Sequence, residues 1–206
     1  MKQDHSAAPT TIRTLSGRRF DFTSHADYPF PIEEIAEVLS RIGRFNHHTR
    51  LHYSVAQHSV LVANMLLAET GDRSLALQGL LHDAAEVYVH DVMAPLKRLI
   101  GPSGHGAIEA SVEAAIAKRF GLPTPLDPRV GVADKTVVWA EIRDLMNHDL
   151  DASEWPNDTP ADLARRIGGQ PLLRKRIVPL SPALARQSFL LRYDALVDDG
   201  EARASS

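Results

Sequence analysis

The segment LLHDAAEVYVHD, residues 80–91, places imidazole and carboxylate groups that could bind a cation or transfer a proton in an apolar background. On a helix that turns about 100° per residue, His82, Asp83 and Glu86 share one arc of the surface. Gly79 falls in the same arc, where its missing side chain would leave the polar groups accessible. Because a helix that is apolar nearly all round is usually buried, the polar stripe should face a polar site inside the protein. The alternative is a half-exposed helix whose polar face is solvated.

Two other ionisable residues also point inward. His58 lies on the apolar face of a helix predicted over residues 54–69, and Asp134 lies on the apolar face of a helix predicted over residues 128–149. Taken alone, such a histidine is usually a hydrogen-bonded core residue, and such an aspartate usually pairs with an arginine. Unpaired buried charge is costly, however, and a single cation would compensate two inward histidines and two inward aspartates together. The pattern therefore predicts one metal site.

The residue types restrict the choice of metal ion. The chain has no cysteine, which excludes disulfides, thiolate metal sites and cysteine nucleophiles. Imidazole and carboxylate ligands suit Co, Mn, Zn, Fe, Ni or Mg, whereas Cu(I) prefers softer ligands. Four protein ligands in an octahedron leave two positions for a water molecule and a substrate oxygen, an arrangement suited to metal-assisted hydrolysis.

The elements that must position these residues are mainly helical. Residues 11–22, TIRTLSGRRFDF, alternate around a Ser-Gly pair and predict a short β-hairpin. The expected fold is all-α with this small N-terminal hairpin, in a single domain of 206 residues. Its core would span about residues 31–150, and residues 151–206 would form a C-terminal helical extension with one short helix within residues 153–171. Apolar residues at helical spacing predict longer helices at about residues 31–43, 54–69, 73–89, 107–121, 128–149 and 181–199.

Composition limits the partners. The formal net charge is −3, which disfavours binding of a nucleic-acid polymer, although a few local cations would suffice for a small charged substrate. The residues after Met1 are polar, unlike the apolar core of a signal peptide, and no run is long and apolar enough to span a membrane. These features favour a cytoplasmic protein without a membrane partner.

The order of His58, the pair His82-Asp83 and Asp134 resembles the H…HD…D pattern of the HD-domain metal-dependent phosphohydrolases. The segments RFNHHTRLHYSVAQHS, LHDAAEVYVHDVMAPLK and VADKTVVWAEIRDL are similar to segments of the bacterial 5'-deoxynucleotidases, and the resemblance covers about residues 35–150. This subgroup and the related phage dNTP triphosphohydrolases are all-helical and usually oligomeric. The resemblance therefore implies an HD-domain helical bundle that forms a homo-oligomer, a dimer or larger.

The resemblance also implies roles for individual residues. Glu86 would act on the nucleophilic water, with Asp91 assisting at the phosphate, although the position of Asp91 near a predicted helix end equally suits a cap or a loop. Arg44 would contact the phosphate and the substrate, Phe45 stands where relatives carry a tryptophan, and Lys97 is a further candidate for phosphate binding. The ligands of the divalent metal ion would be His58, His82, Asp83 and Asp134.

These features predict an enzyme that hydrolyses deoxynucleotides, with a 5'-deoxynucleotidase that releases phosphate from dNMPs as the favoured form. A dNTP triphosphohydrolase, acting for example on dATP, would use the same attack on the α-phosphorus but need more positive charge, which Arg50, Lys97 and Arg98 could supply. A nucleotide-binding regulator without catalysis is disfavoured, because the ligand set and Glu86 are all present. Gln57 departs from the subgroup's pattern, in which an acidic residue often precedes the first histidine.

Overall fold

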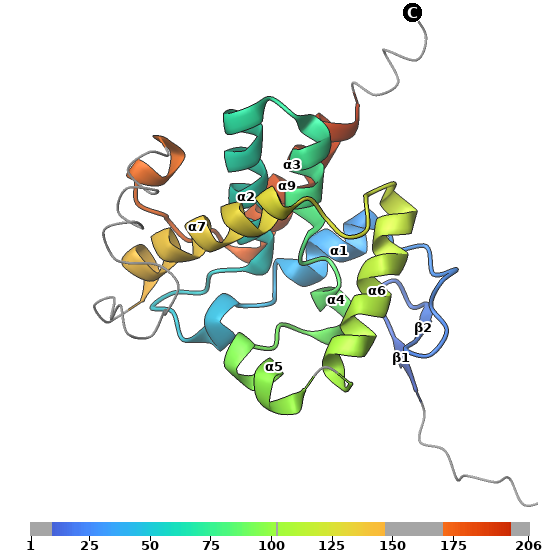
Figure 1. Ribbon diagram of the computed structural model, residues 1–206. Helices are drawn as coiled ribbons and strands as arrows, with labels where there is room; N and C mark the ends of the chain where they lie inside the picture. The colour runs from blue at the N-terminus through green and yellow to red at the C-terminus, as the bar shows by residue number, and fades with distance from the viewer. Residues whose placement is uncertain (1–9, 102, 147–170, 199–206) are drawn as a thin grey trace, which may run out of the picture.

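Helices form most of the described chain, as the sequence predicts. The computed structural model describes residues 10–101, 103–146 and 171–198 (Figure 1). The short helix predicted within residues 153–171 lies almost wholly outside the described residues. None of the helices in the described residues has the length and hydropathy of a membrane span. The helical elements are α1 (Ile32–Leu39), η1 (Arg44–His47), α2 (Val55–Thr70), α3 (Arg73–Leu81), α4 (Glu86–Val89), α5 (Ala94–Ile100), α6 (His105–Phe120), α7 (Pro128–Leu145), η3 (Pro171–Arg174) and α9 (Pro182–Val197).

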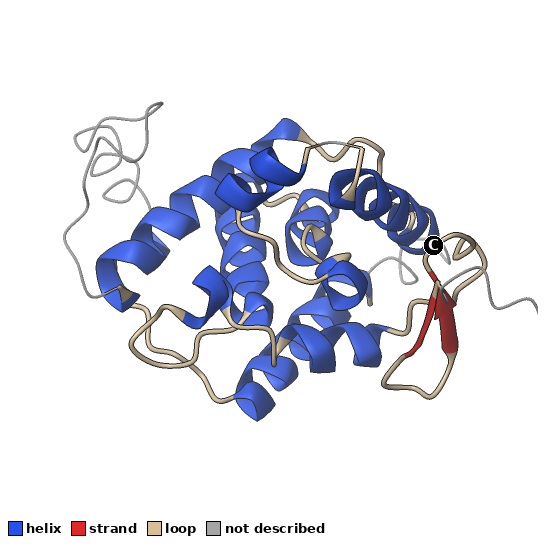
Figure 2. Ribbon diagram, turned by 90° about the horizontal axis from the view of Figure 1, so that it is seen from below, coloured by secondary structure: helices blue, strands red, loops and turns tan. Residues whose placement is uncertain are grey.

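The predicted N-terminal hairpin is confirmed. Strand β1 (Thr11–Arg13) pairs antiparallel with β2 (Arg19–Asp21), and Ile12 lies opposite Phe20. Gly17 closes the turn between the strands with a φ of 77°, a conformation that glycine adopts without strain. Figure 2 shows the hairpin at one edge of the helical assembly. Because Phe20 is fully buried, it anchors the hairpin to the helical core.

Side-chain caps fix where several helices begin. Ser54, Asp72, Asp127 and Ser181 each accept a hydrogen bond from a backbone N–H in the first turn of α2, α3, α7 and α9, respectively. Helix α2 ends at Thr70 and is capped by Gly71, whose φ of 66° suits a helix C-cap. The caps of α2 and α7 matter most for function, because these two helices carry inward-facing ionisable residues.

The prediction of one continuous helix over residues 73–89 is wrong. Helix α3 ends at Leu81, and the next residues form hydrogen bonds three residues apart, the spacing of a 3₁₀ turn, before α4 begins at Glu86. His82 Nδ1 lies 2.8 Å from the carbonyl oxygen of Gly79, so the imidazole forms a hydrogen bond with a backbone carbonyl in the last turn of α3. The break therefore falls at the residues that carry the chemistry.

Gly79 does not open access to the polar groups, contrary to the expectation from the sequence. A Cβ atom at this position would lie 2.6 Å from Leu66 Cδ1 and 3.2 Å from Val62 Cγ1, so Gly79 faces α2. The missing side chain allows α3 to approach α2 closely. This glycine thus serves helix packing.

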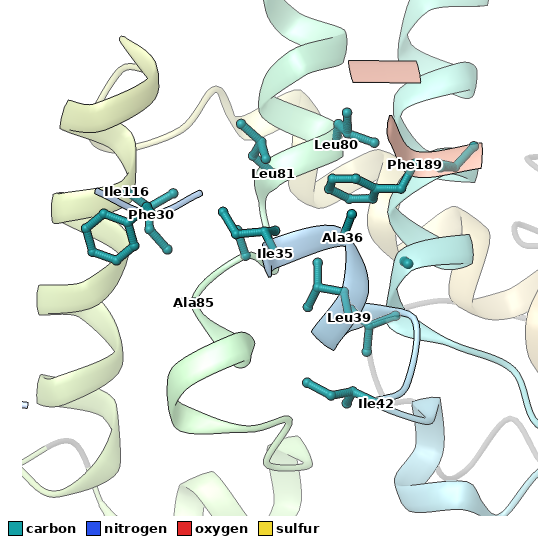
Figure 3. Packing of buried hydrophobic residues seen from close by; sticks show 14 of the residues in the cluster. Phe30, Ile35, Ala36, Leu39, Ile42, Leu80, Leu81, Ala85, Ile116 and Phe189 are labelled. Atoms are coloured by element: carbon teal, nitrogen blue, oxygen red, sulfur yellow. The ribbon is translucent and has the colours of Figure 1, made fainter. Parts of the chain in front are cut away.

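The main core cluster joins helices from both ends of the chain. Ile35 and Leu39 of α1, Leu80 of α3 and Phe189 of α9 are all fully buried, and Figure 3 shows them together in this cluster. Helix α9 packs against α1, α2 and α3, while α4 packs against α1 and α6. A second cluster joins α2 to α7, which crosses α2 in Figure 1. The described C-terminal helix is therefore part of the helical core.

Candidate metal centre

His58 lies fully buried on α2, one turn after the helix begins. Its Nδ1 atom is 2.6 Å from Glu141 Oε1, and because an ionised carboxylate only accepts hydrogen bonds, Nδ1 is the donor. Asp134 Oδ1 lies 3.1 Å from His58 Nε2 without hydrogen-bond geometry, which leaves Nε2 with no hydrogen-bond partner among the described residues. Burial and Arg44 oppose a charge on the ring, but Glu141 and Asp134 outweigh them and raise the pKa of His58 to about 9.

His82 presents its ring beside that of His58, with 5.3 Å between the ring centroids. The bond to Gly79 engages Nδ1, and Nε2 lies 3.2 Å from Asp83 Oδ2. In the part of the chain that the structure describes, this Nε2 is also buried without a hydrogen-bond partner. Two buried ring nitrogens without hydrogen-bond partners are costly, and a bound cation would satisfy both.

His58, His82 and Asp134 form a group that could hold a metal ion. One ligand atom from each lies within 4.8 Å of the other two. Burial opposes the charge of Asp134, but His58, His82 and Arg44 hold the pKa of this carboxyl well below its ordinary value. Asp83 Oδ2 lies 3.7 Å from His58 Nε2, so the fourth predicted ligand borders the same space. Imidazole nitrogens with carboxylates are a donor set that suits a divalent cation.

Arg44 reaches the same carboxylates. Its Nη1 lies 3.5 Å from Asp83 Oδ2, and its Nη2 lies 3.5 Å from Glu141 Oε2 and 4.0 Å from Asp134 Oδ1. Burial disfavours the guanidinium charge, but the carboxylates outweigh burial and raise the pKa of Arg44, so the side chain stays cationic. Arg44 Nε is buried without a hydrogen-bond partner among residues 10–101, 103–146 and 171–198. The guanidinium carbon lies 5.7 Å from the centroid of the Phe45 ring.

A strained turn positions Arg44. The next three residues, Phe45, Asn46 and His47, have φ values of 53°, 51° and 64°, in the left-handed region that residues other than glycine rarely adopt. Gly43 permits this turn, because a Cβ atom there would lie 2.3 Å from His47 Nδ1. Backbone strain of this kind persists only where the surrounding structure enforces it, and it clusters at functional sites.

Glu86 and Asp91 form an acidic pair next to the metal-binding group. Glu86 is buried, and its Oε2 has no hydrogen-bond partner within the described residues. Burial, then Asp83 and Asp91, raise the pKa of Glu86 to about 10, and burial with a contribution from Asp83 also raises the pKa of Asp91. Lys97 acts on both carboxyls through its charge, but its Nζ lies 2.6 Å from Glu109 Oε1 on α6.

The sequence analysis did not predict the buried Glu141, which contacts His58, or the buried Tyr53, whose hydroxyl donates to Glu141. Glu141 Oε1 accepts a hydrogen bond from Tyr53 Oη at 2.8 Å in addition to the contact with His58. Burial opposes the charge of Glu141, but His58 and Arg44 keep its pKa below the ordinary value. A signal was present in the sequence, because Glu141 follows Asp134 by about two helical turns and therefore lies on the same face of α7.

Gln57 fastens the C-terminal region to α2. Its Nε2 donates to Val178 O at 2.8 Å, and its Oε1 accepts from Leu180 N at 2.8 Å. A carboxylate at this position could not donate to the Val178 carbonyl. The packing of the segment before α9 therefore explains why this chain has glutamine where the resemblance leads us to expect an acidic residue.

Comparison with known proteins finds relatives over nearly the whole chain. No family model matches the chain. The chain is 34% identical over 186 residues to YfdR of Escherichia coli strain K12, covering 90% of this chain and 94% of the relative. It is also 34% identical over 194 residues to RCAP_rcc00048 of Rhodobacter capsulatus, again covering 90% of this chain and 94% of the relative. Both relatives are described as uncharacterized proteins, so their names assign no activity.

Proposed function

We propose that this chain, which belongs to the family of the E. coli protein YfdR, is a metal-dependent phosphohydrolase that releases phosphate from deoxynucleoside 5'-monophosphates. One observation carries this proposal. Within the described residues, His58 Nε2, His82 Nε2 and Glu86 Oε2 are buried in one region without hydrogen-bond partners. Buried polar atoms are rarely left in this state, and a cation with a water molecule and a phosphate ester would engage all three.

The cation would be held by the four predicted ligands, with the imidazoles binding through Nε2. Hydrogen bonds from Nδ1 to Glu141 and to the Gly79 carbonyl hold both rings in that orientation. The donor set suits Co, Mn, Zn, Fe, Ni or Mg. When bound, such a cation supplies positive charge against the phosphate oxygens and lowers the pKa of water. These four ligands are His58, His82, Asp83 and Asp134.

Glu86 is suited to take the proton of the attacking water. It begins α4, directly after the turn that carries His82 and Asp83. The ionised carboxylate is the form that accepts a proton, and a neighbouring cation favours that form. As the water oxygen bonds to phosphorus, the bond from phosphorus to the 5' oxygen breaks and the leaving oxygen needs a proton. Asp91, whose pKa is raised by burial, is suited to hold that proton.

Arg44 is suited to bind the phosphate. Its two Nη atoms face Asp83 and Glu141, which fix the plane of the guanidinium, while Nε has no hydrogen-bond partner among the described residues. A guanidinium donates to phosphate oxygens in a fixed planar geometry that a lysine ammonium does not reproduce. We therefore assign the Nε–H donor to a phosphate oxygen of the substrate.

The surroundings support a monophosphate substrate over a triphosphate. A triphosphate would need cations beyond Arg44 for its β- and γ-phosphates. Two of the three candidates are already engaged, because Lys97 is paired with Glu109 at 2.6 Å and Arg50 Nη2 donates to the Asp144 carbonyl oxygen at 2.6 Å, which leaves Arg98 as the remaining candidate. Because both side chains already have partners, they are less suited to additional phosphates.

A screen of dNMPs and dNTPs in the presence of Mn²⁺ or Co²⁺, with identification of the products, tests the proposal. We expect inorganic phosphate and a deoxynucleoside from a dNMP. Release of triphosphate from a dNTP would identify the triphosphohydrolase instead, and nucleotide binding without any product would identify a regulator. His82→Ala protein, purified in the same way, is the matched control for a contaminating phosphatase.

A further inference from the structure

Glu141 lies at the junction between the metal-binding group and Arg44. Its side chain is fully buried on α7. Oε1 accepts hydrogen bonds from His58 Nδ1 at 2.6 Å and Tyr53 Oη at 2.8 Å, and Oε2 accepts from Arg44 Nη2 at 3.5 Å. These donors come from separate parts of the chain, so one carboxylate ties them together.

We propose that Glu141 is a positioning residue that couples the cation site to the phosphate site, holding the His58 ring with one oxygen and the Arg44 guanidinium with the other. This inference rests on the proposed function. A histidine that donates Nδ1–H to a carboxylate keeps its Nε2 lone pair free and aimed, and the carboxylate makes the ring a stronger ligand. Arg44 is held by the same group, so a change at Glu141 reaches both halves of the site.

The alternative is that Glu141 only neutralises buried positive charge and supports the fold. Breaking a buried ion pair is costly in either case, so a loss of stability alone does not separate the two roles. Glu141→Gln does separate them. The amide oxygen can still accept from His58 Nδ1, but the amide nitrogen would face Arg44 Nη2 as donor against donor. A positioning role therefore predicts altered metal coordination and weakened phosphate binding in protein that is still folded.

Tyr53→Phe provides a matched control. Tyr53 is fully buried and donates to the same carboxylate oxygen as His58. Its removal takes one hydrogen bond from Glu141 but leaves the contacts of Glu141 with His58 and Arg44 in place. We expect Tyr53→Phe to lower the thermal midpoint while cation and phosphate binding stay close to wild type.

The experiment measures Co²⁺ binding to metal-stripped protein by calorimetry, the visible spectrum of the Co²⁺-loaded protein, and binding of inorganic phosphate to that loaded form. We expect Glu141→Gln to weaken Co²⁺ binding by about 10–100-fold, to change the Co²⁺ spectrum and to weaken phosphate binding. If the glutamine variant does not fold, Glu141→Asp takes its place in the experiment. This variant keeps the charge but withdraws the carboxylate by one methylene group, and it should also weaken Co²⁺ and phosphate binding.

Three outcomes distinguish the possible failures. If a folded Glu141 variant has a lower thermal midpoint but wild-type Co²⁺ affinity, spectrum and phosphate affinity, Glu141 only supports the fold and the inference is overturned. If Tyr53→Phe changes both affinities as much as Glu141→Gln, the effect belongs to core packing and the inference is likewise overturned. If wild-type protein binds no Co²⁺ at all, the proposed function fails and takes this inference with it.

Discussion

Replacement of Glu86 by glutamine separates a catalytic carboxylate from a structural one. In the folded chain the Glu86 side chain is buried, and Oε2 has no hydrogen-bond partner among the described residues. Burial, then Asp83 and Asp91, raise its pKa from an ordinary value of 4.5 to about 10. In the metal-free chain the carboxyl therefore opposes folding near neutral pH.

The sign and size of this effect follow from proton linkage. Below pH 4.5 both the folded and the unfolded chain hold the proton, so Glu86 has no effect on stability there. At pH 7 the unfolded chain has lost the proton while the folded chain still holds it, which costs about 3 kcal/mol of the free energy of unfolding. The cost grows as pH rises from 4.5 toward 10. Because glutamine does not titrate, metal-free Glu86→Gln should be more stable than wild type at pH 7 by up to this amount.

Catalysis should change in the opposite direction. Loss of a general base typically lowers the rate by about 10²–10⁴-fold, so the variant should be at least about a hundredfold slower in single turnover. The assay combines urea unfolding of metal-stripped wild type and variant at pH 5 and pH 7 with metal content and single-turnover rate on one preparation. A variant that is less stable than wild type at both pH values, or that keeps its rate, would refute the reasoning and identify Glu86 as a structural residue.

Three further predictions concern the surroundings of the centre. Arg44→Lys should lose a charge-assisted hydrogen bond to phosphate, worth about 1.5–3 kcal/mol, and lower kcat/KM by about 10–100-fold with unchanged metal content; wild-type kinetic constants would contradict this. Since the pKa of His58 is raised to about 9 and a ligand imidazole must be neutral, cation affinity should rise by up to about tenfold per pH unit above pH 7 and level off as the pH approaches 9, and calorimetry in several buffers measures the protons released. Gln57→Glu places a carboxylate against the Val178 carbonyl and should lower the free energy of unfolding, measured in urea, by about 1–3 kcal/mol without loss of metal. Equal stability would show that the Gln57 hydrogen bonds do not hold the segment before α9 in place.

The sequence was sufficient to select residues that meet in space. His58 and Asp134 are identifiable because each interrupts an apolar helix face, and a helix face has a fixed period. The structure brings both together with His82. The expectation of a mostly helical chain with an N-terminal hairpin rests on the same kind of local pattern and is confirmed.

Features that depend on tertiary contacts were not predictable in the same way. A hydrogen bond from the His82 side chain to the Gly79 carbonyl stabilises the break between α3 and α4. Hydrophobic periodicity does not predict this hydrogen bond. Gly79 lies on the same predicted arc as the polar residues, yet it is the close approach of α2 that requires a glycine at this position. The burial of Phe189 depends on which helices pack against α9, and the sequence of α9 alone does not specify those partner helices.

The metal content of purified protein tests the central claim most directly. Wild-type protein and the His82→Ala and Asp83→Ala variants would be expressed and dialysed together, and divalent metals would be measured by elemental analysis against folded protein. Arg44→Lys serves as a control that changes the same centre without removing a ligand. We predict a single divalent cation per wild-type chain, retention of metal in Arg44→Lys, and loss of metal together with turnover in both ligand variants. Unchanged metal stoichiometry in both His82→Ala and Asp83→Ala would contradict the account.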